Sequence, residues 1–176
     1  IDGQVYFFGG NNIFNNYVTS TVDAYDEPSD SWLLDVAQYA TPIANVGSVV
    51  FGGQIYVFGG SGYGTHGYTQ ARRFDPISHT FVDLAPLPVG RITPHPFVMG
   101  ADIWVAGGFD YNPVVPSTTQ ILTIDIYHPA TDTWTPGPVM PAGDWNYDAG
   151  VFANGLVYAL YGGASTRLYV LDPSHG

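Results

Sequence analysis

The side chains of this chain that could bind a ligand or do chemistry are mostly polar or aromatic. They gather in short segments between apolar runs. Aromatic rings and amides together suit neutral, polar ligands such as a glycan or a protein segment. The candidate binding residues are Asn45, Tyr63, His66, Arg91, His95, Asp110, Tyr111, Asn112, Asp144, Trp145 and Tyr147, with Asn11, Asn12, Asn15, Asn16, Tyr17 and Tyr68 in similar segments. Turns also favour asparagine and glycine for conformational reasons, so each of these residues has a purely structural alternative.

Catalytic patterns in the sequence are weak. The separation of His66 and His95 matches no compact metal-binding motif. The chain has no cysteine, which excludes thiolate metal sites and a cysteine nucleophile. Glu27 is the only glutamate, so a pair of carboxylates for acid–base catalysis is hard to place. We therefore predict no catalytic residue, no metal site and no cofactor.

The charge balance excludes several classes of partner. The chain has 4 Lys+Arg against 15 Asp+Glu, a formal net charge of -11. An acidic surface of this kind repels phosphate backbones and anionic lipids, so nucleic acid and membrane surfaces are excluded as partners. No apolar run reaches the roughly 18 residues of a membrane-spanning helix, so we predict no membrane insertion.

Two sequence markers repeat along the chain. An apolar run that ends in a glycine pair occurs four times, and its first glycines are Gly9, Gly59, Gly107 and Gly162, at spacings of 50, 48 and 55 residues. A turn-like marker follows each pair, at Tyr25-Asp26-Glu27-Pro28, Phe74-Asp75-Pro76, Tyr127-His128-Pro129 and Leu171-Asp172-Pro173. In the first three copies an aromatic residue lies seven positions further on, at Trp32, Phe81 and Trp134.

This pattern resembles the kelch repeat, whose period is about 50 residues. The resemblance covers essentially the whole chain. It implies an all-β fold, a kelch-type β-propeller with four-stranded antiparallel blades. We expect a single propeller domain or part of one over residues 1–176, a partial or small ring with blades at about 1–42, 43–90, 91–140 and 141–176.

The second repeat illustrates the expected blade. Its four strands are predicted at 47–51, 54–58, 69–74 and 80–84, with Gly52-Gly53 in a tight hairpin turn and Asp75-Pro76 in the next turn. The same division predicts 3, 4, 4 and 3 strands in the four copies, which leaves open strands in the first and last. The glycine pairs are expected where backbones approach closely, and Trp32, Phe81 and Trp134 are expected to pack between blades.

Alternating strand directions place two sets of loops at one end of the propeller, and function is expected in such loops. The loops between second and third strands are predicted at 11–19, 61–67, 109–118 and 164–166, and those between blades at 39–46, 86–95 and 138–147. Arg91 matches the arginine that often opens a kelch repeat and commonly lines the site in ligand-binding members of the family. The equivalent places in the flanking copies carry Asn45 and Asp144-Trp145, so a ring of identical arginines is not present.

The predicted function is a non-enzymatic binding module that recognises a glycan or a protein through these loops. The alternative is an assembly protein whose copies join through open terminal strands into a dimer or filament. An enzyme ranks third, because a chain without cysteine cannot build the tyrosine–cysteine crosslink of the copper oxidases that share this fold. The lysine-free composition, rich in tyrosine, asparagine, threonine and glycine, favours an extracellular or cell-surface location.

Overall fold

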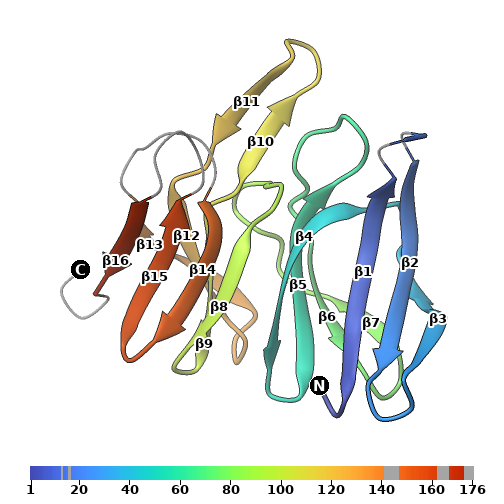
Figure 1. The fold of residues 1–176 in the computed structure, drawn as a ribbon. Helices are drawn as coiled ribbons and strands as arrows, with labels where there is room; N and C mark the ends of the chain where they lie inside the picture. Colours follow the sequence, from blue (N-terminus) through green and yellow to red (C-terminus); the bar gives the residue numbers. More distant parts are fainter. Residues whose placement is uncertain (13, 16, 141–146, 162–166, 173–176) are drawn as a thin grey trace.

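The fold is known from a computed structural model, which describes residues 1–12, 14–15, 17–140, 147–161 and 167–172. These residues form sixteen β-strands and no helix, which confirms the predicted all-β class. No helix that could cross a membrane is found in the described part of the chain. The strands form four antiparallel sheets that stand side by side in chain order, and a separate hairpin projects from one end (Figure 1).

We number the sheets as blades 1 to 4. Blade 1 contains β1 (Gln4–Asn12), β2 (Tyr17–Asp26) and β3 (Ser31–Gln38). Blade 2 contains β4 (Ala44–Phe51), β5 (Gln54–Ser61), β6 (Ala71–Asp75) and β7 (Thr80–Asp83). Blade 3 contains β8 (His95–Met99), β9 (Asp102–Ala106), β12 (Thr123–His128) and β13 (Thr133–Val139), and blade 4 contains β14 (Tyr147–Ala153), β15 (Leu156–Tyr161) and β16 (Arg167–Leu171). The predicted strand numbers of 3, 4, 4 and 3 are confirmed for the described residues.

The turns of blade 2 follow from their residue types. Gly52 and Gly53 both have positive φ values, of 58° and 75°, which glycine adopts at little cost. The carboxylate of Asp75 accepts hydrogen bonds from the amides of Ile77 and Ser78, at 2.8 Å and 3.0 Å. These local bonds reverse the chain between β6 and β7, as the sequence predicted.

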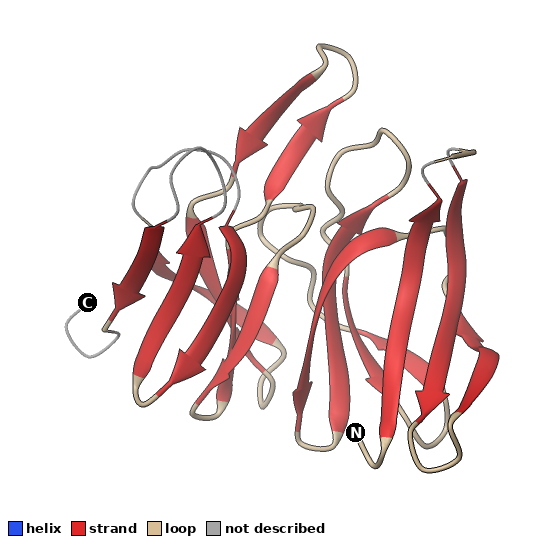
Figure 2. Cartoon of the chain, viewed as in Figure 1, coloured by secondary structure: helices blue, strands red, loops and turns tan. Residues whose placement is uncertain are grey.

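Two of the predicted loops are largely strand. Residues 109–118 belong mostly to a hairpin of β10 (Phe109–Asn112) and β11 (Ser117–Gln120), which pair with each other and with no other sheet (Figure 2). In the segment 11–19, β1 continues to Asn12 and β2 starts at Tyr17. The aromatic and β-branched residues of both segments favour pairing over an irregular loop, a preference that the loop prediction overlooked.

The core lies between the blades. Blades 1 and 2 bury Val22, Ile43, Val57 and Phe74, and blades 2 and 3 bury a second cluster that includes Phe58. Phe81 packs on Tyr39 with ring centroids 4.7 Å apart, and Trp134 packs on Phe58 at 5.7 Å. The prediction that the repeated aromatic residue packs between blades is therefore confirmed for blades 2 and 3.

The glycine pairs receive the chain segments that link one blade to the next. The amide of Gly10 donates to the carbonyl of Ile43, and the amide of Gly60 donates to the carbonyl of Arg91, both at 2.9 Å. Gly59 has a φ of 65°, and a Cβ added there would overlap the same Arg91 carbonyl oxygen. The predicted close approach of backbones at these pairs is thus confirmed.

Candidate binding surface

The candidate surface is the end of the molecule that carries the β10–β11 hairpin, uppermost in Figure 1. We call it the loop face and define it by three described segments: the linker 39–43, the β5–β6 connection 62–70 and the hairpin 109–120. Strand directions bring these segments, which come from different blades, to one end. The predicted clustering of loops is therefore present in the described structure.

His66 and Asp110 tie two of these segments together. Nδ1 of His66 lies 2.8 Å from a carboxylate oxygen of Asp110. The other carboxylate oxygen of Asp110 accepts a 2.7 Å hydrogen bond from the amide of Gly67. The contact joins the β5–β6 connection of blade 2 to the base of the hairpin in blade 3, so the two predicted site residues hold the loop face in shape.

The electrostatics of Asp110 favour its charged form. Partial burial works to raise the pKa of its carboxyl. The hydrogen bonds from the Gly67 amide and from His66 outweigh this effect, so the pKa lies below its ordinary value. Asp110 is therefore a carboxylate at neutral pH, and the link to His66 persists there.

Arg91 lies inside the fold. Its side chain has no exposed surface and forms an ion pair with Asp125. One guanidinium nitrogen also donates to the carbonyls of Val105, Gly107 and Thr123, at 3.3, 3.1 and 3.3 Å. Burial lowers the pKa of Arg91, and the neighbouring Asp125 opposes that shift. Arg91 joins the segment between blades 2 and 3 to β9 and β12, which is a structural role, while its predicted ligand contact stays a prediction.

The tip of the hairpin is apolar and exposed. Val114 is 85% exposed and Val115 is 65% exposed, between Pro113 and Pro116. The side chain of Asn112 accepts hydrogen bonds from the amides of Val114 and Val115, at 2.9 Å and 3.2 Å. The turn is thus fixed by Asn112, and two valine side chains are presented to solvent.

The other predicted residues have mixed positions. Tyr63 is exposed beside the His66 segment, and Tyr111 is half-buried on the hairpin. His95 is half-buried at the start of β8, and Asn45 is an exposed residue of β4 with a φ of 58°. Of the remaining three, Asp144 and Trp145 lie outside the described residues, and Tyr147 is described only as the first backbone position of β14.

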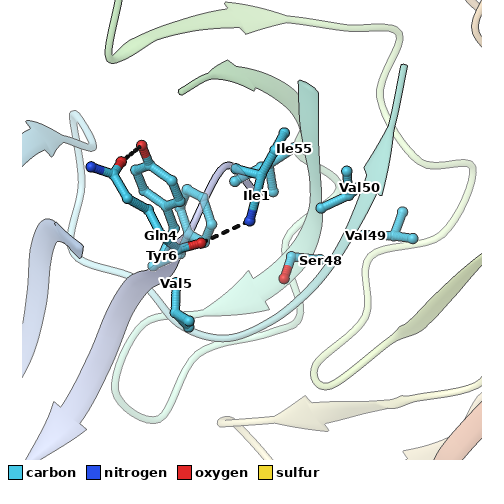
Figure 3. A pocket seen from close by; sticks show the side chains of 9 residues that line it. Ile1, Gln4, Val5, Tyr6, Ser48, Val49, Val50 and Ile55 are labelled. Atoms are coloured by element: carbon cyan, nitrogen blue, oxygen red, sulfur yellow. Dashed lines mark hydrogen bonds between the residues drawn. The ribbon is translucent and has the colours of Figure 1, made fainter. Parts of the chain in front are cut away.

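Among the hollows on the described surface, two are informative. One, of about 520 Å³, lies on the loop face between Thr41 and the segment 67–70. The other, of about 240 Å³, lies between β1 and the β4–β5 hairpin (Figure 3). Its lining includes Val5, Tyr6 and Val49, and it contains none of the predicted site residues. Neither hollow gathers acid–base groups, and no set of three potential metal ligands occurs among the residues that the structure describes.

Comparison with protein families identifies the repeat. The family model of the kelch motif matches residues 42–88. Alpha-scruin from Limulus polyphemus is 28% identical over 140 residues, covering 74% of this chain and 14% of scruin. Kelch-like protein 38 from Homo sapiens is 31% identical over 147 residues, covering 80% of this chain and 22% of that protein. The chain therefore spans about a fifth of the length of this second relative and less of the first.

Solved structures show the same fold. The structure of YjhT superimposes with a TM-score of 0.74 at 17% identity, covering 91% of this chain and 56% of that one. A fungal alcohol oxidase of the AA5 family, solved in complex with copper, gives a TM-score of 0.70 at 21% identity, covering 92% and 35%. At identities this low, the two structures support the β-propeller architecture of this chain and say nothing about its chemistry.

Three residues with a role in this part of the structure were not among the predicted ones. Asp125, the partner of Arg91, is a single aspartate in an apolar strand, and a charged residue there signals a buried partner. Val114 and Val115 stand between two prolines in a segment with alternating strand-like residues, a pattern typical of a hairpin. The sequence contains both signals, but the segment 109–118 is predicted as a loop and Asp125 is not singled out.

Proposed function

Because this chain belongs to the kelch-repeat family of β-propellers, we propose that it is a non-enzymatic binding module that recognises a protein partner through its loop face. The observation that carries the proposal is the β10–β11 hairpin, which projects from the blades with two exposed valines at its tip (Figure 1). Adjacent exposed apolar side chains on a projecting hairpin are available to a partner surface, and this availability supports the proposal.

The hairpin is held in place before any partner binds. Asp110 fixes its base through His66 and the Gly67 amide, and Asn112 fixes its turn. Preorganisation of this kind lowers the entropy lost on binding. It supports a recognition role better than a role as a flexible connection.

A protein ligand fits this surface better than a glycan. Val114 and Val115 offer aliphatic groups that suit an apolar groove on a protein. The amide groups that would read sugar hydroxyls are partly used within the chain, since Asn12, Asn15 and Asn112 accept bonds from nearby backbone amides. The net charge of -11 favours a partner surface that is neutral or basic.

Panning a displayed library of random peptides on the purified chain tests the proposal. We expect enrichment of peptides that combine apolar and basic residues. Binding of the enriched peptides should weaken at least about tenfold in the Val114→Ser, Val115→Ser double variant, because the apolar contact is lost. The matched control is Ile77→Ser, since Ile77 is 86% exposed in the β6–β7 turn at the opposite end of the blades.

Three outcomes would contradict the proposal. The first is a library that yields no enriched peptide, and the second is a double variant that binds as well as the wild type. The third is submillimolar binding of neutral glycans without peptide binding, which would favour the glycan alternative.

A further inference from the structure

A second surface, distinct from the loop face, lies on the side of blade 1 that points away from blade 2. Strand pairing sets Val5 opposite Tyr25, and Tyr25 opposite Trp32. Cross-strand partners share one face of a sheet, and Phe7 follows Val5 by two positions on the same strand. We call these four side chains, Val5, Phe7, Tyr25 and Trp32, the open face of blade 1.

Blades 2 and 3 bury the residues at the same repeat positions. Val5, Phe7 and Trp32 are 50%, 46% and 54% exposed. The residues equivalent to Val5, Phe7 and Tyr25 are 5% exposed or less: Ile55, Val57 and Phe74 in blade 2, and Ile103, Val105 and Tyr127 in blade 3. In each case the blade that comes before in the chain provides the cover. Among the described residues, no blade covers this side of blade 1.

Blade 4 carries an open face of the opposite kind. In β16, Leu168 and Val170 pair with Leu160 and Tyr158 of β15. Leu168 and Val170 are 57% and 52% exposed. The equivalent pairs are Val22 and Ala24 in blade 1, Ala71 and Arg73 in blade 2, and Ile124 and Ile126 in blade 3, where each is buried or half-buried. We call Tyr158, Leu168 and Val170 the open face of blade 4.

These two kinds of face already pack on each other within the chain. Between blades 1 and 2, Phe8 meets Phe74 with ring centroids 5.4 Å apart. Between blades 2 and 3, Phe58 meets Tyr127 at 6.1 Å. In both interfaces the first blade offers the face that blade 4 leaves open, and the second blade offers the face that blade 1 leaves open. The two open faces are therefore complementary in kind.

We propose that two copies of this chain associate head to tail, with the open face of blade 4 in one copy packed on the open face of blade 1 in the other. Figure 1 places blades 1 and 4 at opposite ends of the row, so one copy does not bring its own two faces together. The sequence predicted assembly by pairing of strand edges, whereas the exposed side chains favour packing of sheet faces. A contact between unlike faces is heterologous.

The charge of the chain sets the conditions for this association. Each copy carries a formal net charge of -11, and two such copies repel each other at low ionic strength. The packed faces are mainly apolar, so their attraction does not depend on salt in the same way. Association should therefore become tighter as salt is raised from low to physiological concentrations.

Light scattering across a range of protein concentrations tests the proposal. At physiological salt and the highest concentrations, the wild type should exceed its monomer mass of 19.0 kDa by about twofold or more. Trp32→Asp and Val170→Asp should each remain monomeric, because a charge in either face opposes packing. Ile77→Asp introduces the same charge at an apolar position outside both faces that is more exposed, at 86%, and it should associate as the wild type does.

Mixing the two blocked variants identifies which faces meet. Trp32→Asp keeps its blade 4 face, and Val170→Asp keeps its blade 1 face, so an equimolar mixture should form a one-to-one complex that neither variant forms alone. A wild type that stays monomeric at every protein concentration up to about 100 μM would overturn the proposal. So would a mixture that stays monomeric, or self-association of either variant through like faces. Peptide binding at the loop face would be unaffected by any of these results.

Discussion

Blades 1 and 3 carry related residues at the same repeat positions, but the burial and the contacts of these residues differ between the two blades. In blade 3, Trp134 packs against blade 2 and its indole N–H donates to the carbonyl of Ala85 at 2.8 Å. In blade 1, the equivalent Trp32 is mostly exposed and contacts rings of its own sheet, Phe7 and Tyr25. The repeat supplies an aromatic residue in both places, but only a neighbouring blade makes it part of a core.

A polar clamp shows the same difference. In blade 3, Asp132 accepts bonds from the Tyr127 hydroxyl at 2.7 Å and from the amide of Ala85 in blade 2 at 2.8 Å. In blade 1, Asp30 accepts the matching bond from Tyr25 at 2.5 Å. The bond between the tyrosine and the aspartate lies within one blade and is encoded in the repeat. The bond from the Ala85 amide exists only where a preceding blade is present. Comparing equivalent residues in the two blades therefore separates local from inter-blade stability.

The largest difference is expected at Asp125 and its blade 1 equivalent, Asp23. Asp125→Ala should lower the free energy of unfolding by about 3 to 5 kcal/mol, because it leaves Arg91 as a buried charge without its partner. Asp23 is half-buried and accepts one bond from the Asp35 amide, so Asp23→Ala should cost about 1 kcal/mol. Urea unfolding of dilute samples measures the free energy of unfolding of both variants.

A double variant sharpens this test. Replacing both partners, Arg91→Met with Asp125→Leu, should recover a large part of the stability lost in Asp125→Ala, since no buried charge remains. If Asp125→Ala were as mild as Asp23→Ala, the buried ion pair would not hold blade 3 to the preceding segment.

The second difference concerns the two tryptophans. Trp134→Ala should cost about 3 kcal/mol, because it opens a cavity against Phe58 and removes the bond to Ala85. Trp32→Ala should cost less than about 1 kcal/mol in a dilute sample, because the ring is already exposed. Equal losses in the two variants, measured by urea unfolding, would show that Trp32 is covered in the monomer.

A third and smaller difference separates two glycines with positive φ. Gly59→Ala should cost more than about 2 kcal/mol, because the new Cβ meets the Arg91 carbonyl. Gly52→Ala should cost about 1 kcal/mol, since nothing lies within 4 Å and only the left-handed backbone is strained. Thermal unfolding of the two variants gives the order, and a reversal would contradict the close approach at the blade linker.

The smallest effect is expected on the loop face. Asp110→Asn should lower the free energy of unfolding by less than about 1 kcal/mol at pH 7, because the partly exposed pair with His66 is screened by solvent. The pKa of Asp110 is lowered in the folded state, so its contribution is present above the ordinary carboxyl pKa of about 4 and is lost as the pH falls through the folded value. The difference between wild type and variant should therefore shrink below about pH 4. A difference that is constant down to pH 3 would contradict this assignment.

The blades were predictable from the sequence because each marker has a local cause. Glycine pairs require positive φ, Asp75 organises its own turn, and alternating apolar residues define strands. The hairpin is not predicted, because the glycine pair before it marks the end of a strand in every copy of the repeat. Its strand-like residues lie outside the repeat, so comparison of the copies gave no guide to them.

The candidate site was harder to predict because residue type does not reveal direction. Arg91 suits a ligand chemically, but it follows a link between blades, where Asp125 and backbone carbonyls surround it. Asn112 suits a sugar, but its side chain is used by its own turn. His66 and Asp110 are 44 residues apart, and only the packing of two blades brings them into contact.

Because the chain has no cysteine, a single introduced thiol measures directly which blade faces are covered in the monomer and which become covered on association. Val5→Cys and Ile55→Cys occupy the same repeat position in blades 1 and 2, and their reaction with a maleimide is compared over a range of protein concentrations. We expect Ile55→Cys to be protected at every concentration, and Val5→Cys to react rapidly in dilute samples and at least about tenfold more slowly in concentrated ones. Reaction of Val5→Cys at one rate throughout, fast or slow, would contradict it.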